Sequence, residues 1–248
     1  MKAIEVRDAA KRFRLYYDRS RTLKERLLFC ARSVFCEHWV LNGLSFAAEQ
    51  GEAIGIVGEN GCGKSTTLRL LARILYPDRG SVEVRGRVAC LIELGAGFHP
   101  DMNGIENIYL NAAMFGLGRR ETARRLDEII AFSELEPHIE NPIRTYSTGM
   151  YMRLAFSVAV CVEADVLLID EILAVGDLNF QAKCLERLRR IRDRGTTVVI
   201  VSHSLEQVEA FCSRSIWISE GRAAADGPPE QTHAAYRAFM AARKGEGA

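Results

Sequence analysis

The sequence predicts an α/β fold in which helices cover a mostly parallel sheet and a purely helical subdomain is inserted. Strand-like and helical segments alternate along most of the 248 residues, as in layered α/β domains. Several strand-like runs are short and continuously apolar, which is typical of strands buried on both faces. One long stretch, from Gly104 to about Val160, has a helical pattern throughout and no convincing strand.

The predicted elements divide the chain into a core and three additions. The predicted strands are Ala3–Val6, Val40–Ala47, Ala53–Val57, Ser81–Val84, Val88–Ile92, Val166–Ile169, Thr197–Val201 and Ser215–Ile218. The main helices outside the inserted stretch are Lys64–Leu75, Asn179–Arg194, Leu205–Phe211 and Pro229–Lys244. We therefore expect a core of residues 1–103 and 161–226, a helical subdomain of residues 104–160, a basic insertion of residues 11–38 and a C-terminal helix of residues 227–248.

The composition excludes several classes of protein. A net charge of +1 gives no global field that would favour nucleic acid. The longest apolar run, Leu154 to Val162, falls short of the roughly 20 residues of a membrane span. The N-terminus lacks the apolar segment of a secretory signal, so we expect the chain in the cytosol unless a partner holds it elsewhere. Seven cysteines without a CxxC spacing predict reduced thiols that pack as small apolar residues.

A basic segment lies between the first two predicted strands. From Lys11 to Phe35 it carries eight positive and two negative residues, a local net charge of +6. Within it, Thr22-Leu-Lys-Glu25 has the pattern of a capping box, which predicts a short amphipathic helix. Two interpretations remain open: a solvated surface helix, or a surface that meets a membrane or an anionic ligand.

A phosphate-binding loop follows the strand Ala53–Val57. Gly58-Glu-Asn-Gly-Cys-Gly-Lys-Ser65 fits the pattern GxxxxGK[ST] and opens a helix near Lys64, which is the context that the motif requires. The loop amides and the positive end of the helix favour phosphate, Lys64 reaches the β- and γ-phosphates of ATP, and Ser65 holds Mg²⁺. The residues expected to contact the nucleotide here are Gly58, Asn60, Gly61, Gly63, Lys64, Ser65 and Thr66.

An acidic pair ends another buried strand. Val166–Ile169 is followed by Asp170 and Glu171, at the edge of the sheet where ligands bind in open α/β folds. Asp170 is expected to orient Mg²⁺, and Glu171 to act as the general base that polarises the attacking water. An acidic pair is common at strand ends and would alone be weak evidence for a metal site. Together with the phosphate-binding loop in the same chain, it is strong evidence.

The segment Tyr146-Ser-Thr-Gly-Met150 resembles the LSGGQ signature of ABC ATPases. The resemblance implies that Ser147 and Gly149 offer a hydroxyl and an amide at a helix N-terminus to a γ-phosphate. In that family these groups act across a dimer and complete the site of a second copy. Asp177 ends a segment that looks like the D-loop, and His203 resembles the switch histidine that contacts the γ-phosphate.

The resemblance to ABC ATPases, motif by motif in the expected order, implies an ABC-type nucleotide-binding domain, with an antiparallel β subdomain beside the α/β core. The same resemblance implies ATP hydrolysis with Mg²⁺, an ATP-dependent homodimer and a separate membrane permease. Two assignments are irregular. No glutamine stands where the strand meets the helical subdomain, so Glu93 is the candidate for the metal or water contact. The usual spacing from Lys64 gives Phe35 as the ring that stacks on adenine, with rivals at Phe13, Tyr16 and Trp39.

Three segments resemble the branch of the family that exports O-antigen, capsular polysaccharide or teichoic acid: Glu93–Pro100, Tyr146–Tyr151 and Asp170–Asp177. This resemblance implies a lipid-linked polysaccharide as substrate and a place at the cytoplasmic face of the inner membrane. The alternatives are a small-solute transporter, or a non-transport ABC ATPase. An importer would more often show the glutamine and a glycine pair in the signature, whereas a non-transport member would usually show a coiled coil or two tandem cassettes.

Overall fold

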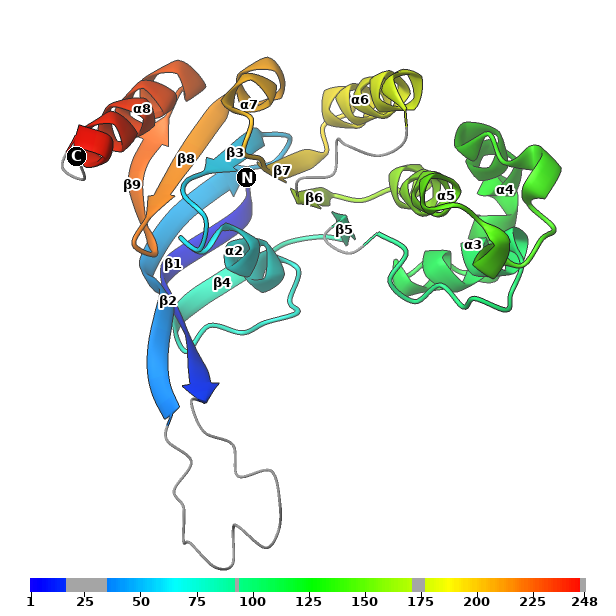
Figure 1. Cartoon of the computed structure of the whole chain (residues 1–248), viewed down its shortest axis with the longest axis horizontal. Coiled ribbons are helices and arrows are strands. Elements are labelled where there is room, and N and C mark those ends of the chain that lie inside the picture. Colours follow the sequence, from blue (N-terminus) through cyan, green and yellow to red (C-terminus); the bar gives the residue numbers. More distant parts are fainter. Residues whose placement is uncertain (17–34, 92–93, 171–176, 246–248) are drawn as a thin grey trace, which may run out of the picture.

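The computed structural model describes residues 1–16, 35–91, 94–170 and 177–245, which form an α/β core, a smaller sheet and a helical lobe (Figure 1). Among these residues the core sheet has the strand order β5–β6–β7–β3–β8–β9. Every neighbouring pair is parallel except β8 and β9, which confirms the predicted mostly parallel sheet. Its strands are β3 Ala53–Val57, β5 Val88–Leu91, β6 Val166–Asp170, β7 Thr197–Val201, β8 Arg214–Ser219 and β9 Arg222–Gly227.

Both faces of the core sheet are covered. Ile54 and Ile56 of β3 pack with helix α2 and the smaller sheet, whereas Ala53 and Val57 pack with the helices of the opposite face. This double burial explains the continuous apolar strands, because neither face meets water. The helices are α2 Lys64–Leu71 on the first face and α6 Leu178–Asp193, α7 Leu205–Phe211 and α8 Pro229–Gly245 on the second.

Strand β9 was not predicted from the sequence. Arg222–Gly227 contains no β-branched or aromatic residue, so its intrinsic strand preference is weak. It pairs with β8 through a tight turn in which Glu220 and Gly221 both have positive φ, 49° and 73°. Such a turn matches the twist of a hairpin, and the pairing with β8 therefore makes the strand.

The smaller sheet is antiparallel and has the strand order β2–β1–β4, which confirms the expected β subdomain. Its strands are β1 Lys2–Tyr16, β2 Phe35–Glu49 and β4 Arg79–Val84. Strands β1 and β2 continue well beyond the predicted strands, as a long hairpin that projects from the body of the molecule (Figure 1).

The predicted boundaries of the basic insertion were wrong at both ends, because residues 11–16 and 35–38 belong to β1 and β2. Arg12 shows why the hairpin extends. Its guanidinium lies 2.6 Å from the Glu37 carboxylate and 5.6 Å from the centre of the Trp39 ring on the opposite strand. Such cross-strand pairs stabilise extended backbone. The predicted capped helix around Thr22 lies outside the described residues, so its two interpretations stay open.

The helical subdomain forms a lobe with a core of its own, beside the sheet (Figure 1). Its helices are α3 Gly104–Met114, α4 Arg119–Ser133 and α5 Thr148–Cys161. Helix α3 begins with a complete capping box, in which Asn103 accepts from the Glu106 amide and Glu106 accepts from the Asn103 amide. No helix in the described part of the chain has the length and apolar character needed to cross a bilayer.

Buried cysteines serve as packing residues. Burial raises the pKa of the Cys161 thiol to about 11, and those of Cys184 and Cys212 to about 12. These thiols therefore stay protonated at neutral pH and behave as small apolar groups. This agrees with the prediction from the scattered cysteine spacing.

Candidate functional site

Three strands bring the predicted site residues to one edge of the core sheet. In the register of the sheet, Ile56 of β3 lies beside Val201 of β7, and Val201 lies beside Asp170 of β6. The three strands therefore end level with one another. The phosphate-binding loop, Asp170 and the turn at His203 follow at this common edge, and neighbouring strands are about 4.8 Å apart. The sequence-based prediction that these motifs converge is consistent with this arrangement.

The phosphate-binding loop needs glycine at two positions where other parts of the chain approach it. Gly58 is buried with φ of 148°, and a Cβ atom there would lie 2.4 Å from the Ile218 carbonyl oxygen. Gly63 has φ of 109°, and its Cβ would lie 2.5 Å from Cδ2 of Leu41. Gly63 is also the N-cap of α2 and offers no side-chain hydrogen bond. The first turn of the helix is thus arranged for an anion rather than for a capping side chain.

Lys64 folds back over the same loop and is only 6% exposed. Its Nζ donates to the carbonyl oxygens of Gly58 and Glu59, each at 2.8 Å. Both acceptors are neutral, so these hydrogen bonds orient the ammonium group without cancelling its charge. A phosphate group in the loop would supply the missing negative charge, and this chemistry fits a bound nucleotide.

The residues expected to hold Mg²⁺ fit that ion in their chemistry. Ser65 is exposed in the first turn of α2, and Asp170 is half-buried at the end of β6. A hydroxyl and a carboxylate are the hard oxygen ligands that Mg²⁺ prefers. Bound there, Mg²⁺ would neutralise developing charge on the phosphates. Two other predicted residues, Glu171 and Glu93, lie outside the described residues, and their roles stay predictions.

His203 lies in a short turn between β7 and α7, at the same edge. Ser202 Oγ accepts from the Ser204 amide at 3.1 Å, and Ser204 Oγ caps α7 by accepting from the Gln207 amide at 3.3 Å. These two hydrogen bonds fix the backbone on either side of His203, whose side chain is exposed. The position agrees with the predicted contact to a γ-phosphate, which stays a prediction.

A β-bulge decides which aromatic residues face the phosphate-binding loop. Lys11 lies opposite Leu41, but Arg12 lies opposite Trp39, so Val40 is an extra residue in β2. Directly opposed residues share a face of the sheet. Leu41 faces the phosphate-binding loop, because its side chain touches Gly63. Trp39 and Arg12 consequently lie on the other face.

The predicted stacking role of Phe35 conflicts with this register. Phe35 lies opposite Tyr16, on the face of Trp39, and its ring centre is 4.9 Å from the Arg14 guanidinium. Phe13, opposite His38, instead shares the face of Leu41. Of the four aromatic candidates, Phe13 alone lies on the face of the phosphate-binding loop. Counting residues back from Lys64 cannot reveal this, because the bulge at Val40 reverses the alternation of faces.

The signature-like segment begins helix α5 in the helical lobe. Ser147 is exposed, and its Oγ accepts from the Met150 amide at 3.2 Å. Ser147 and Gly149 line an open hollow of about 640 Å³ with residues of the same lobe and Asp177. Asp177 caps α6 and lies 2.5 Å from Arg153 of α5; the hydrogen bond from the Phe180 amide is the main cause of its lowered pKa. None of the residues that line this hollow belongs to the phosphate-binding loop of the same chain.

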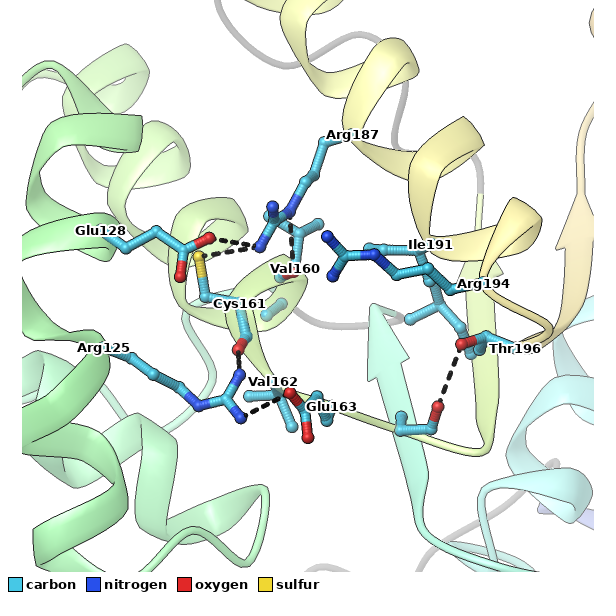
Figure 2. Close-up of a pocket in the computed structure, with 13 residues that line it drawn as sticks. Arg125, Glu128, Val160, Cys161, Val162, Glu163, Arg187, Ile191, Arg194 and Thr196 are labelled. Carbon is cyan, nitrogen blue, oxygen red and sulfur yellow. Dashed lines mark hydrogen bonds and ion pairs between the residues drawn. The ribbon is translucent and has the colours of Figure 1, made fainter.

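The opposite end of α5 is held by arginines from both parts of the molecule (Figure 2). Beside a cavity of about 410 Å³, Arg125 of α4 donates to the Cys161 carbonyl at 2.6 Å. Arg187 of α6 donates to the Val160 carbonyl at 3.3 Å and pairs with Glu128 of α4 at 2.7 Å. Guanidinium groups suit the last carbonyls of a helix, which carry partial negative charge. The core and the lobe thus meet at the C-terminal end of the signature helix.

Sequence reasoning missed three residues that hold the connection from β5 to the lobe. The Tyr151 hydroxyl donates to the Gly95 carbonyl at 2.8 Å, and Asn111 Nδ2 donates to the Ala96 carbonyl at 3.0 Å. Asn107 is fully buried and hydrogen-bonds both the amide and the carbonyl of His99. The available signal was the pair Asn107 and Asn111, two amides one turn apart on the apolar face of a helix. The Tyr151 hydrogen bond therefore links this connection directly to helix α5, which carries the signature-like segment.

Comparison with known proteins agrees with this geometry. Residues 41–174 match the family model described as ABC transporter. The chain belongs to the ABC transporter family. As a member it binds and hydrolyses ATP, and the matched residues include the phosphate-binding loop, Asp170 and the start of α5.

Relatives of this ABC ATPase span nearly its whole length. It is 43% identical over 243 residues to the O-antigen export system ATP-binding protein RfbB of Klebsiella pneumoniae, covering 96% of this chain and 98% of that one. It is 44% identical to the RfbB protein of Myxococcus xanthus, over 96% of this chain and 56% of the relative. It is 37% identical to the teichoic acids export ATP-binding protein TagH of Bacillus cereus, over 96% and 43% of the two chains.

Solved structures share the fold of this ABC ATPase at low sequence identity. The ATP-binding subunit of an ABC transporter superposes with a TM-score of 0.74 at 23% identity, over 92% of this chain and 91% of that one. A dimeric structure of the ATP-binding cassette MJ0796 with ADP and Pi gives a TM-score of 0.72 at 18% identity, over 91% and 98% of the two chains. At these identities the likeness establishes the fold alone.

Proposed function

We propose that this ABC ATPase powers the export of a lipid-linked polysaccharide through a separate membrane permease. The observation that carries the proposal is the 43% identity to an O-antigen export ATP-binding protein over 98% of that relative's length. We place the chain at the cytoplasmic face of the inner membrane, as a peripheral subunit, because the proposed permease lies in that membrane. Two copies would close on ATP and hydrolyse it at two shared sites.

The proposed mechanism assigns each motif a task. The loop amides and Lys64 bind the β- and γ-phosphates, and Ser65 with Asp170 would hold Mg²⁺. Glu171 would take a proton from the attacking water, and His203 would contact the γ-phosphate. Ser147 of one copy would donate its hydroxyl to the γ-phosphate bound by the other. Catalysis of this kind is positioning plus electrostatic stabilisation, with no covalent intermediate on the protein.

An exposed apolar surface near the end of α2 supports a permease partner. Ile74 is 59% exposed and Met114 of α3 is 61% exposed, and both line a cavity of about 360 Å³. The cavity is lined mainly by apolar side chains, with Asn111 as its polar group. Exposed apolar patches of this kind mark protein contacts. The same cavity includes Gly95 and Ala96, so a partner seated there would touch the connection that Tyr151 joins to the signature helix.

The proposal is tested by reconstituting the chain with a multi-span permease from its gene neighbourhood in lipid vesicles. We expect lipid-linked O-antigen to stimulate ATP hydrolysis and to move across the bilayer with wild-type protein. Glu171→Gln is expected to bind ATP but to support neither process. Stimulation by a solute-binding protein with a small solute, or no response to any lipid-linked glycan, would instead favour a small-solute transporter.

A further inference from the structure

The C-terminal helix α8 docks on the core through one face. His233 is fully buried near its start, with Nε2 3.1 Å from Ser215 Oγ and Nδ1 2.8 Å from Glu209 Oε1. One and two turns later along the helix, the ring centres of Tyr236 and Phe239 lie 5.7 and 5.1 Å from that of Trp217. Burial of these groups fixes the helix along β8, where Figure 1 shows it beside β8 and β9.

Helix α8 runs toward the edge of the core sheet at which the phosphate-binding loop lies. Strand β8 is parallel to β3, so its C-terminal end lies at the same edge as the phosphate-binding loop. Helix α8 passes first Ser215 and then Trp217, and so follows β8 toward that edge. Arg243 follows Phe239 by four residues and so lies on the same side of the helix, with its guanidinium 5.7 Å from the centre of the Phe239 ring.

Arg243 reaches the phosphate-binding loop itself. Its Nη1 lies 2.6 Å from the Glu59 carboxylate, and Glu59 is the second residue of the GxxxxGKS motif. The carbonyl oxygen of the same Glu59 accepts from Lys64 Nζ at 2.8 Å. Burial raises the pKa of Tyr236, and the nearby negative charge of Glu59 adds to the effect. Two residues of α8, Arg243 and Tyr236, therefore interact electrostatically with Glu59. The mechanism proposed above for ATP hydrolysis gives this interaction no role.

We propose that Arg243 is a positioning residue for nucleotide binding, through which the docking of α8 sets the affinity of the phosphate-binding loop for ATP. The triphosphate of ATP is anionic, and the Glu59 carboxylate is a like charge on the loop that binds it. Arg243 neutralises this carboxylate and fixes its side chain. Without Arg243 the negative charge stays unpaired beside the phosphates. The proposal needs only ATP binding and is independent of the exported substrate.

The test measures the Kd for a fluorescent ATP analogue with the full chain. Arg243→Ala is expected to raise Kd about two- to five-fold at low salt, the range of a partly exposed ion pair. The difference should shrink at high salt, because exposed charges are screened. Arg243→Lys should retain most of the affinity and Arg243→Glu should lose more than Arg243→Ala. The loss should lie in Kd and not in the hydrolysis rate at saturating ATP.

A matched control separates this role from the stability of the helix. Arg237 is a second exposed arginine of α8, six residues before Arg243, and it lies 3.7 Å from Glu209, whereas Arg243 pairs with Glu59. Arg237→Ala should leave Kd unchanged, and Trp217 fluorescence should report whether α8 stays docked in each variant. In a Glu59→Gln background Arg243→Ala should have no further effect. An unchanged Kd in Arg243→Ala, equal losses in both arginine variants, or an undiminished loss in the Glu59→Gln background would overturn the proposal.

Discussion

Helices α2 and α5 both begin at a predicted phosphate site, but their first turns offer different groups. Helix α2 begins at a glycine without a side-chain cap, and the buried ammonium of Lys64 lies over its loop. Helix α5 begins at Ser147, an exposed residue whose hydroxyl oxygen already accepts from the helix's own Met150 amide. The first terminus offers a full positive charge and loop amides, whereas the second offers only neutral hydrogen-bond donors.

This difference predicts distinct roles for the two helix ends in ATP binding and in ATP hydrolysis. A site with a buried cation and a backbone cradle can hold a triphosphate by itself. A neutral, open helix end contributes only when another surface brings a phosphate to it. We therefore expect α2 to set the affinity for ATP, and α5 to set the rate after a second copy has closed on the first.

The largest effect is expected from Lys64→Ala, which removes the buried positive charge of the α2 site. ATP hydrolysis should fall about 10²- to 10³-fold, as for the loss of a preorganised group that stabilises transition-state charge. ATP affinity should fall with it, which equilibrium binding of ATP would show. Normal ATP affinity in this variant would contradict the role assigned to α2.

A smaller effect is expected from Ser147→Ala. Hydrolysis should fall about 10- to 100-fold, because a hydrogen bond to a charged phosphate is lost. ATP affinity of the single chain should change little. Loss of the cap also destabilises α5, so Asn103→Ala, which removes the cap of α3 in the same lobe, is the control. If both variants slow hydrolysis equally, the effect of Ser147 is only structural.

The smallest effect is expected at the far end of α5. Arg187→Ala removes the ion pair to Glu128 and the hydrogen bond to the Val160 carbonyl. It should cost about 1 kcal/mol and lower Tm by about 2–4 °C. Arg190→Ala is the control, since Arg190 forms an ion pair with Glu186 of its own helix and is 64% exposed. A Tm for Arg187→Ala that matches this control would show that the arginines do not fix the end of α5.

The sequence predicted the parts of the site that are short and contiguous. The phosphate-binding loop and Asp170 each follow an apolar strand directly, so their place in the fold depends only on where that strand ends. The stacking role predicted for Phe35 conflicts with the strand register, because the face of Phe35 depends on a bulge at Val40 that a residue count does not reveal. Strand β9 was missed because its pairing with β8, and not its own residues, makes it a strand. The hydrogen bonds of Tyr151 and Asn107 join segments that are distant in the sequence.

The central claim is that each ATP site uses α2 of one copy and α5 of another. The most direct test mixes Lys64→Ala with Ser147→Ala and measures ATP hydrolysis of the mixture. A two-fold dimer of the two variants holds one site with both defects and one site with neither. We predict a rate clearly above the sum of the two separate variants. A rate equal to that sum, at concentrations where Glu171→Gln forms an ATP-bound dimer, would contradict the claim.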